Sequence, residues 1–111
     1  MPLSALARRA AHMFKDRIEA SQGPRIRSVR VFGSRARGDW NEGSDLDILV
    51  LVDHRDPSLD RTILEASCSV EEELGFTFLI SPRIMAQEHF EELLQRELRL
   101  ARDIIAEGVI V

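Results

Sequence analysis

The sequence predicts a small α/β fold in which helices pack on a β-sheet, and three observations lead to it. Apolar residues recur at helical spacing in three segments, short β-branched runs lie between them, and glycine or proline stands at most boundaries. A length of 111 residues suits a single domain, here 1–111. The apolar share of 44% and the charged share of 31% are typical of a folded protein, which argues against disorder.

The beginning of the chain predicts one helix and one strand. Apolar residues at helical spacing predict a helix over 3–21, which Gly23-Pro24 ends. The β-branched run 26–32 predicts a strand that ends at Gly33. The glycine-rich segment 34–44 then predicts a turn, or a single helical turn followed by a loop.

The clearest strand of the sequence covers 45–52. Its residues alternate between two faces, and beyond Asp47 both faces are apolar. A strand that is apolar on both faces is typical of the centre of a sheet covered on both sides. We therefore expect this strand to be central, with Asp45 and Asp47 at its beginning.

The remaining elements complete the order helix, strand, loop, strand, helix, strand, helix. The predicted elements are a helix over 59–74 closed by Gly75, a strand over 76–80 ended by Ser81-Pro82, a long helix over 90–105, and an apolar tail at 109–111 that is compatible with a short strand. Such an order is that of a small α/β sandwich.

Composition narrows the functional classes. A net charge of −4 argues against binding of a polyanion by the fold as a whole, so nucleic acid is not an expected partner. The single cysteine, Cys68, has no partner for an internal disulfide, which fits a cytoplasmic protein. The apolar run 48–52 is far shorter than the roughly 20 residues that a membrane span needs, so no membrane association is expected.

Two carboxylates at the beginning of the central strand are the candidate metal ligands. Residues two apart on a strand point the same way, so Asp45 and Asp47 present their side chains to one face. Two anions this close repel each other and need a counter-charge, and Mg²⁺ commonly takes one or two carboxylates together with substrate phosphates. The pair therefore indicates metal-assisted phosphoryl or nucleotidyl transfer. Taken alone, Asp45 is also compatible with capping and Asp47 with a surface position.

The segment before these carboxylates predicts a phosphate-binding turn. Gly33 lets the backbone approach a bulky anion, and Ser34 offers a hydroxyl and an amide. Arg35 and Arg37 are both candidates for pairing with phosphate, and Arg37 lies on the same side of a helical turn as Ser34. Trp40, in the loop that follows, covers this loop or stacks on a base or a partner; we favour the former.

Together these features resemble the signature of the minimal nucleotidyltransferases, within the DNA polymerase β-like superfamily. The match consists of Gly33-Ser34, ten intervening residues that include Arg37-Gly38, and Asp45-x-Asp47. Its specific part covers 31–52, and it extends loosely to the last helix and the segment 107–110. The resemblance implies the nucleotidyltransferase fold of the α+β type, with a small mixed sheet flanked by helices.

The resemblance also implies a site and a biological setting. It implies ATP or another NTP as substrate, bound at Gly33, Ser34 and Arg37, with Asp45 and Asp47 as catalytic ligands of one or two Mg²⁺ ions. Members of the family are often antitoxins that pair with a helical HEPN-type protein and transfer AMP from ATP to a tyrosine on it. A chain of this length leaves no room for a second recognition domain, so the acceptor is expected on another macromolecule.

One departure from the family pattern leaves the enzyme class open. Active members usually carry a third carboxylate on a later strand, where it helps to activate the acceptor hydroxyl. The predicted strand 76–80 contains no Asp or Glu, and Thr77 stands at the matching position. A nucleotidyltransferase is favoured, while a binding module that neutralises or regulates its partner by contact, or a nucleotide-sensing subunit, remains an alternative. The acceptor, the base preference and the oligomeric state stay open.

Overall fold

The sheet is mixed, as the resemblance predicts. The computed structural model describes residues 3–111, and within them four strands have the order β3-β2-β1-β4. The strands are β1 (Ile26–Phe32), β2 (Leu46–Val52), β3 (Ile80–Ala86) and β4 (Val109–Ile110). β1 runs antiparallel to β2 and β4, whereas β2 and β3 are parallel and joined through a helix.

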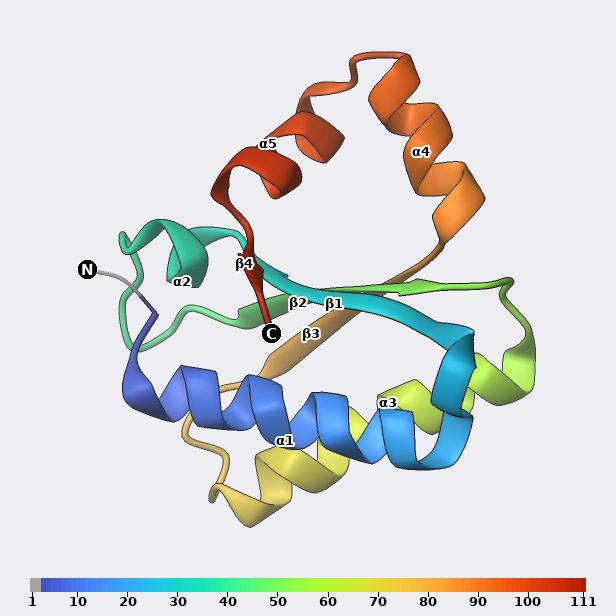
Figure 1. The fold of residues 1–111 in the computed structure, drawn as a ribbon. Coiled ribbons are helices and arrows are strands. Elements are labelled where there is room, and N and C mark those ends of the chain that lie inside the picture. Colours follow the sequence, from blue (N-terminus) through green and yellow to red (C-terminus); the bar gives the residue numbers. More distant parts are fainter. Residues whose placement is uncertain (1–2) are drawn as a thin grey trace.

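Helices cover both faces of this sheet (Figure 1). α1 (Ala5–Gln22) and α3 (Pro57–Glu73) lie on one face, whereas α4 (Gln87–Gln95) and α5 (Arg99–Glu107) lie over the other. A short 3₁₀ turn, η1 (Gly23–Arg25), links α1 to β1, and the single turn α2 (Ser34–Arg37) follows β1. Among the helices of residues 3–111, none is both long and apolar enough to cross a membrane.

The caps explain where the two long helices begin. The Oγ of Ser4 accepts a hydrogen bond from the amide of Ala7 at 3.1 Å, and the carboxylate of Asp56 accepts one from the amide of Leu59 at 2.8 Å. Such caps satisfy amides that a helix leaves unpaired at its start. Helix α1 ends at Gly23, whose φ of 53° favours glycine. The predicted helix over 3–21 is therefore confirmed.

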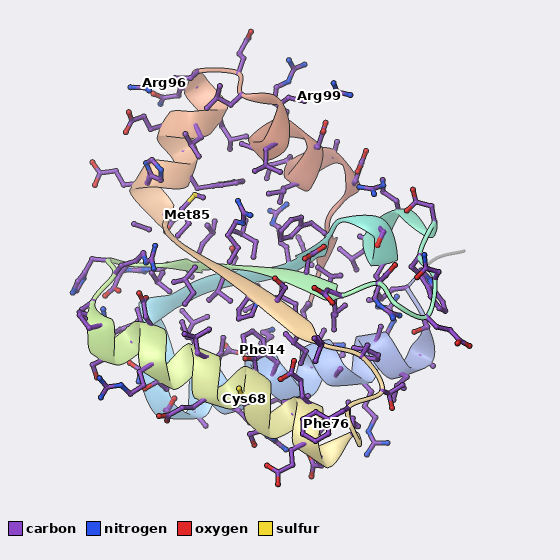
Figure 2. All side chains as sticks on the ribbon, turned by 180° about the vertical axis from the view of Figure 1, so that it is seen from behind. Phe14, Cys68, Phe76, Met85, Arg96 and Arg99 are labelled. Atoms are coloured by element: carbon purple, nitrogen blue, oxygen red, sulfur yellow. The ribbon has the colours of Figure 1, made fainter. Side chains whose placement is uncertain are left out.

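Strand β2 is buried on both faces, as its sequence predicts. Leu46, Ile48, Val50 and Val52 face the main core with α1 and α3, where Phe14 also packs (Figure 2). On the opposite face, Leu49 and Leu51 pack in a second cluster with the α4 and α5 residues Phe90, Ala101 and Ile104. Asp47 belongs to this second face by alternation. The candidate ligand is therefore carried by the strand that packs against helices on both faces of the sheet.

The third strand lies later in the chain than the sequence predicts. It covers Ile80–Ala86 instead of 76–80, so Ser81-Pro82 does not end it. Residues Gly75 and Phe76 both have positive φ, which turns the chain away from α3, and pairing begins only where Leu46 donates its amide to the Leu79 carbonyl. Pro82 is tolerated because β3 pairs with β2 alone and is an edge strand.

The last predicted helix is two helices. Helix α4 ends at Gln95 and α5 begins at Arg99, where a single helix over 90–105 is predicted. Glu97 between them has a φ of 56°, which no helix interior adopts. The break turns α5 back across the sheet, so both short helices bury apolar residues over Leu49 and Leu51. The apolar tail forms β4, which confirms the short strand.

Candidate active site

The turn after β1 has the conformation that its glycines dictate. Gly33 has φ 75° and ψ −157°, a region that is essentially closed to other residues. The turn α2 follows directly, with the amide of Arg37 bonded to the Gly33 carbonyl at 3.1 Å. Gly38 ends it in the left-handed region with φ 89°. Ser34 is therefore the first residue of a turn whose leading amides have no partner within the turn.

Asp47 lies directly against this turn. It pairs across the sheet with Phe32, the residue before Gly33. A Cβ on Gly33 would overlap Asp47 Oδ2 and lie 3.3 Å from Asp47 Cγ. The structure thus brings the predicted phosphate turn and the predicted metal ligand into van der Waals contact. Only a residue without a side chain fits at position 33.

The two carboxylates are arranged as a pair that a cation can join. Asp45 is exposed and directly precedes β2, while Asp47 is half-buried within it. Burial raises the pKa of Asp47, and the charge of Asp45 raises it further, against the opposing charges of Arg83 and Arg37. Within residues 3–111, no third His, Cys, Asp or Glu completes a metal-binding group. Two carboxylates together with phosphate oxygens still form a suitable set of ligands for Mg²⁺.

Arg37 is held at the edge of the site by two carboxylates. Its Nε lies 3.3 Å from Asp39 Oδ2, and a terminal nitrogen lies 3.7 Å from Glu107 Oε2. Its side chain remains 44% exposed, and its charge reaches Asp47, whose pKa it lowers. Arg37 therefore lies where a negatively charged ligand beside Asp47 can bind it.

Arg35 does not face this site, contrary to its prediction as a phosphate partner. Its side chain is 4% exposed, and its guanidinium lies between the rings of Trp40 and Phe78, 4.7 and 4.6 Å from their centroids. Its Nε donates to the carbonyl of Ser44 at 3.0 Å. Burial lowers the pKa of Arg35, although the charge of Asp45 opposes this. Arg35 and Trp40 thus fix the loop before Asp45, and Trp40 covers that loop as favoured.

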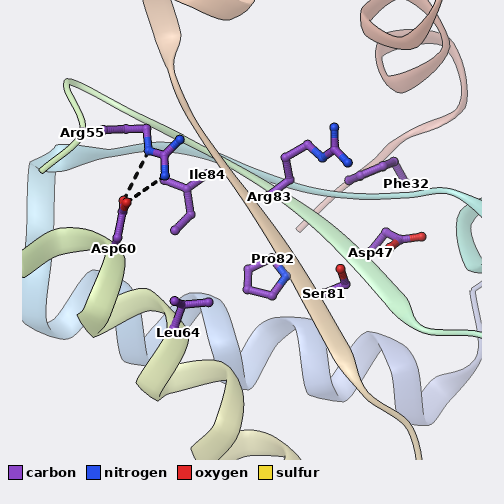
Figure 3. A pocket seen from close by; sticks show the side chains of 9 residues that line it. All are labelled: Phe32, Asp47, Arg55, Asp60, Leu64, Ser81, Pro82, Arg83 and Ile84. Carbon is purple, nitrogen blue, oxygen red and sulfur yellow. Dashed lines mark hydrogen bonds and ion pairs between the residues drawn. The ribbon is translucent and has the colours of Figure 1, made fainter. Parts of the chain in front are cut away.

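The residues beside Asp47 on β3 are a serine and an arginine. Asp47 pairs with Ser81 in the parallel ladder, and Leu49 pairs with Arg83. Asp47, Ser81 and Arg83 line a cavity of about 510 Å³ that also reaches Arg55 (Figure 3). Arg55 is paired with Asp60 at 2.7 Å. The cavity thus opens beside Asp47 along the edge strand β3.

Thr77 is not the counterpart of the third carboxylate. It precedes β3, and its hydroxyl donates to the Leu74 carbonyl at 2.8 Å. The register instead puts Ser81 next to Asp47, and β3 contains no Asp or Glu. The alignment of Thr77 with the missing carboxylate is therefore wrong, because Thr77 lies before the strand that pairs with β2. The alternation of Ser81 and Arg83 with apolar neighbours is the sequence signal that could have identified both residues.

Comparison with known proteins identifies the family of this chain. The sequence profile of the family described as "Nucleotidyltransferase domain" matches residues 13–110. Two proteins of Methanocaldococcus jannaschii, each provisionally named a protein adenylyltransferase, are similar in sequence. One is 37% identical over 71 residues, which are 64% of this chain and 71% of the relative. The other is 40% identical over 45 residues, which are 40% of this chain and 45% of the relative.

Solved structures show the same fold. A structure provisionally described as a minimal nucleotidyltransferase has a TM-score of 0.56 and 29% identity, over 100% of this chain and 97% of its own. A mutant of the MntA–HpeT toxin–antitoxin has a TM-score of 0.51 and 16% identity, over 86% of this chain and 68% of its own. The latter shows likeness of fold alone. This chain belongs to the nucleotidyltransferase domain family, and the family together with the adenylyltransferase-named relatives favours the nucleotidyltransferases as its enzyme class.

Proposed function

We propose that the protein transfers a nucleoside monophosphate, AMP from ATP in the favoured case, to an acceptor in a Mg²⁺-dependent reaction. The contact between Gly33 and the carboxylate of Asp47 carries this proposal. It supports the proposal because a turn suited to phosphates then lies beside Asp47, one of two carboxylates suited to a metal. In this proposal Gly33, Ser34 and Arg37 bind the nucleotide, and Asp45 and Asp47 are the catalytic metal ligands.

Each residue has a defined part in the transfer. Asp45 and Asp47 hold Mg²⁺, which supplies neutralisation of phosphate charge. Ser34 donates from its hydroxyl and amide to phosphate oxygens, and Arg37 exchanges its exposed contacts with Asp39 and Glu107 for phosphate. The acceptor hydroxyl oxygen bonds to the α-phosphorus and its proton passes to water, while the bond from this phosphorus to the bridging oxygen breaks and pyrophosphate leaves.

The acceptor is proposed to lie on a partner protein. The relatives provisionally named protein adenylyltransferases support a protein acceptor, and the fold shared with the MntA–HpeT antitoxin complex supports a toxin partner. We therefore extend the proposal to an antitoxin that modifies a helical HEPN-type protein. A cytoplasmic location belongs to this proposal, and Cys68, which is exposed and not in a disulfide, is compatible with it.

Labelling of the partner tests the proposal. The protein, ATP labelled at the α-phosphate, Mg²⁺ and the product of the neighbouring gene are incubated together, and transfer is followed on a gel. Label is expected on the neighbour, and it is expected to disappear with EDTA and with the double variant Asp45→Ala and Asp47→Ala. If no metal or partner yields label while the protein is folded, the enzyme is excluded.

Neutralisation by contact alone is the second candidate, because no carboxylate of β3 faces Asp47. The two candidates differ in their dependence on the metal pair. Substitution of Asp45→Asn and Asp47→Asn preserves shape but removes both charges. If the double variant still binds the toxin and still protects cells from it, contact suffices; if binding persists while protection is lost, transfer is required.

A further inference from the structure

Two arginines lie side by side with Leu49 on the face of the sheet that carries Asp47. Leu49 pairs with Arg30 on one side and with Arg83 on the other. Paired residues of neighbouring strands share a face, so both arginines lie on the side of α4 and α5. The row Phe32, Asp47, Ser81 is the preceding row of the same face. The α-carbons of Arg30 and Arg83 are therefore about 10 Å apart, two strand spacings, a distance that two arginine side chains can bridge.

Neither guanidinium has a hydrogen-bond or ion-pair partner within residues 3–111. Among the buried side-chain nitrogen and oxygen atoms of residues 3–111, Arg30 Nε alone has no hydrogen-bond partner. A buried N–H of this kind is rare, because its desolvation is not compensated. Arg83 is exposed and takes part in no hydrogen bond or ion pair of the described chain.

The other arginines near this site differ in this respect. Arg37 is paired with Asp39 and Glu107, and Arg55 is paired with Asp60. The positive charge of Arg83 acts on Asp47, whose pKa it lowers, so this guanidinium lies within electrostatic reach of the metal pair. In Figure 3, Arg83 extends from β3 above the sheet on the side of Phe32. Two guanidinium groups without a partner among the described residues thus lie on one face of the sheet. The paired residues that carry them, with Leu49 between them, adjoin the paired residues that include Asp47.

We propose that Arg30 and Arg83 form a binding site for a phosphate oxyanion next to the Asp47 site. The planar guanidinium donates several N–H groups in a fixed geometry that matches the oxygens of a phosphate. The oxyanion completes the hydrogen bonding of Arg30 Nε and bridges the two side chains, with Arg83 reaching it from the cavity beside Asp47. Its source is either the leaving phosphates of the nucleotide or a phosphate carried by the acceptor. The site stands on the two arginines, whereas the choice between these sources rests on the proposed function.

Binding of inorganic phosphate and pyrophosphate, measured by calorimetry without divalent metal or nucleotide, tests the site itself. Arg30→Gln and Arg83→Gln are each expected to weaken binding by about tenfold or more, because each removes charge-assisted hydrogen bonds. Arg61→Gln is the matched control: it removes an equal charge from an exposed position on α3, across the sheet. Arg30→Lys and Arg83→Lys keep the charge and should recover part of the affinity, provided that circular dichroism shows each variant to be folded.

Kinetic constants then identify the source of the oxyanion. If the site holds the leaving phosphates, Arg30→Gln and Arg83→Gln raise the KM for ATP and weaken inhibition by pyrophosphate. If it holds an acceptor phosphate, the KM for ATP stays unchanged and that for the acceptor rises. The proposal is overturned if both glutamine variants bind phosphate and pyrophosphate as Arg61→Gln does. If the glutamine variants lose phosphate binding while the wild type transfers no AMP, the site is retained and the proposed function is rejected.

Discussion

The carboxylate of Asp47 lies against the α-carbon of Gly33, so closely that a side chain at position 33 would overlap Asp47 Oδ2. One residue belongs to the turn after β1 and the other to the central strand β2. Their contact fixes the turn relative to the candidate metal ligands, because the pairing of Phe32 with Asp47 sets the register of the two strands. The geometry of the site therefore depends on the smallest residue in it.

Substitution of Gly33→Ala is expected to disable the site. The new Cβ displaces the Asp47 carboxylate, and an error of about 1 Å in a reacting group lowers a rate by about 100-fold. The backbone conformation, with φ 75°, adds a destabilisation of about 1–3 kcal/mol. Transfer of label from ATP and chemical unfolding measure the two effects.

Gly23→Ala is the control for backbone strain at position 33. Gly23 also has positive φ, 53°, but a Cβ there meets nothing within 4 Å. The control should lose stability while it keeps transfer and metal-dependent nucleotide binding. Equal loss of transfer in both variants would show that strain alone, and not the contact with Asp47, explains the effect.

Two arginines of the turn α2 should give opposite results. Arg35→Met removes the bond to Ser44 and the contacts with Trp40 and Phe78 from a buried site, so a loss of about 1–3 kcal/mol in unfolding free energy is expected. Arg37→Met removes an exposed cation, so stability should hardly change while ATP affinity falls by about tenfold. Unfolding curves and calorimetric titration separate them. Unchanged ATP affinity in Arg37→Met would remove Arg37 from the phosphate site.

These arginines illustrate what the sequence can predict about the site. Asp45 and Asp47 are two residues apart, so alternation suffices to predict that they share a face, and the glycine at position 33 suffices to predict a turn. Arg35 turns away from the site because its guanidinium packs between Trp40 and Phe78, and the sequence does not place Phe78, which lies far along the chain, near it. Long-range packing of this kind leaves no local pattern.

The position of β3 shows the same limit for the fold. The apolar run before Ser81 predicts a strand, and Pro82 predicts its end, because proline lacks an amide for the ladder. Whether proline ends a strand depends on whether the strand is at an edge, which is a property of the whole sheet. Glu71 gives a similar case. The sequence Glu71-Glu72-Glu73 predicts a solvated helix face, but the Glu71 carboxylate accepts a hydrogen bond from the amide of Ile80 at 2.7 Å and fixes the start of β3.

The cap of α3 makes stability depend on pH. Asp56 accepts the amide of Leu59, and this bond, followed by the ion pair with Arg25 at 2.9 Å, lowers the pKa of Asp56. A lowered pKa in the folded state gives stability that is present above the unfolded pKa, near 4, and is lost as pH falls through the folded value. The melting temperature should therefore fall with pH in the acidic range.

Asp56→Asn isolates the charge in this prediction, because asparagine also caps helices well. The difference in melting temperature between the wild type and Asp56→Asn should be largest at neutral pH and should close as the pH falls below about 4. Asp16→Asn serves as control, since Asp16 is exposed and makes no hydrogen bond or ion pair within the described residues. A difference for Asp56→Asn that stays constant with pH would contradict the role of its charge.

Ser81→Asp is expected to supply the carboxylate that β3 lacks. Ser81 is exposed and pairs with Asp47, so an aspartate there shares a face with the metal pair and faces the cavity of about 510 Å³. A carboxylate in this place can take the proton of a hydroxyl acceptor, and general-base catalysis contributes about 10²-fold or more. We therefore expect faster transfer of label from ATP, with greater dependence on Mg²⁺ because three carboxylates then repel one another.

Thr77→Asp is the control, because it adds the same charge before the strand, where the Thr77 hydroxyl donates to the Leu74 carbonyl at the end of α3, and it should leave the rate unchanged. A gain in Thr77→Asp without one in Ser81→Asp would restore the alignment that the sequence alone predicts. No gain in either variant would show that transfer by this chain is not limited by removal of the acceptor proton.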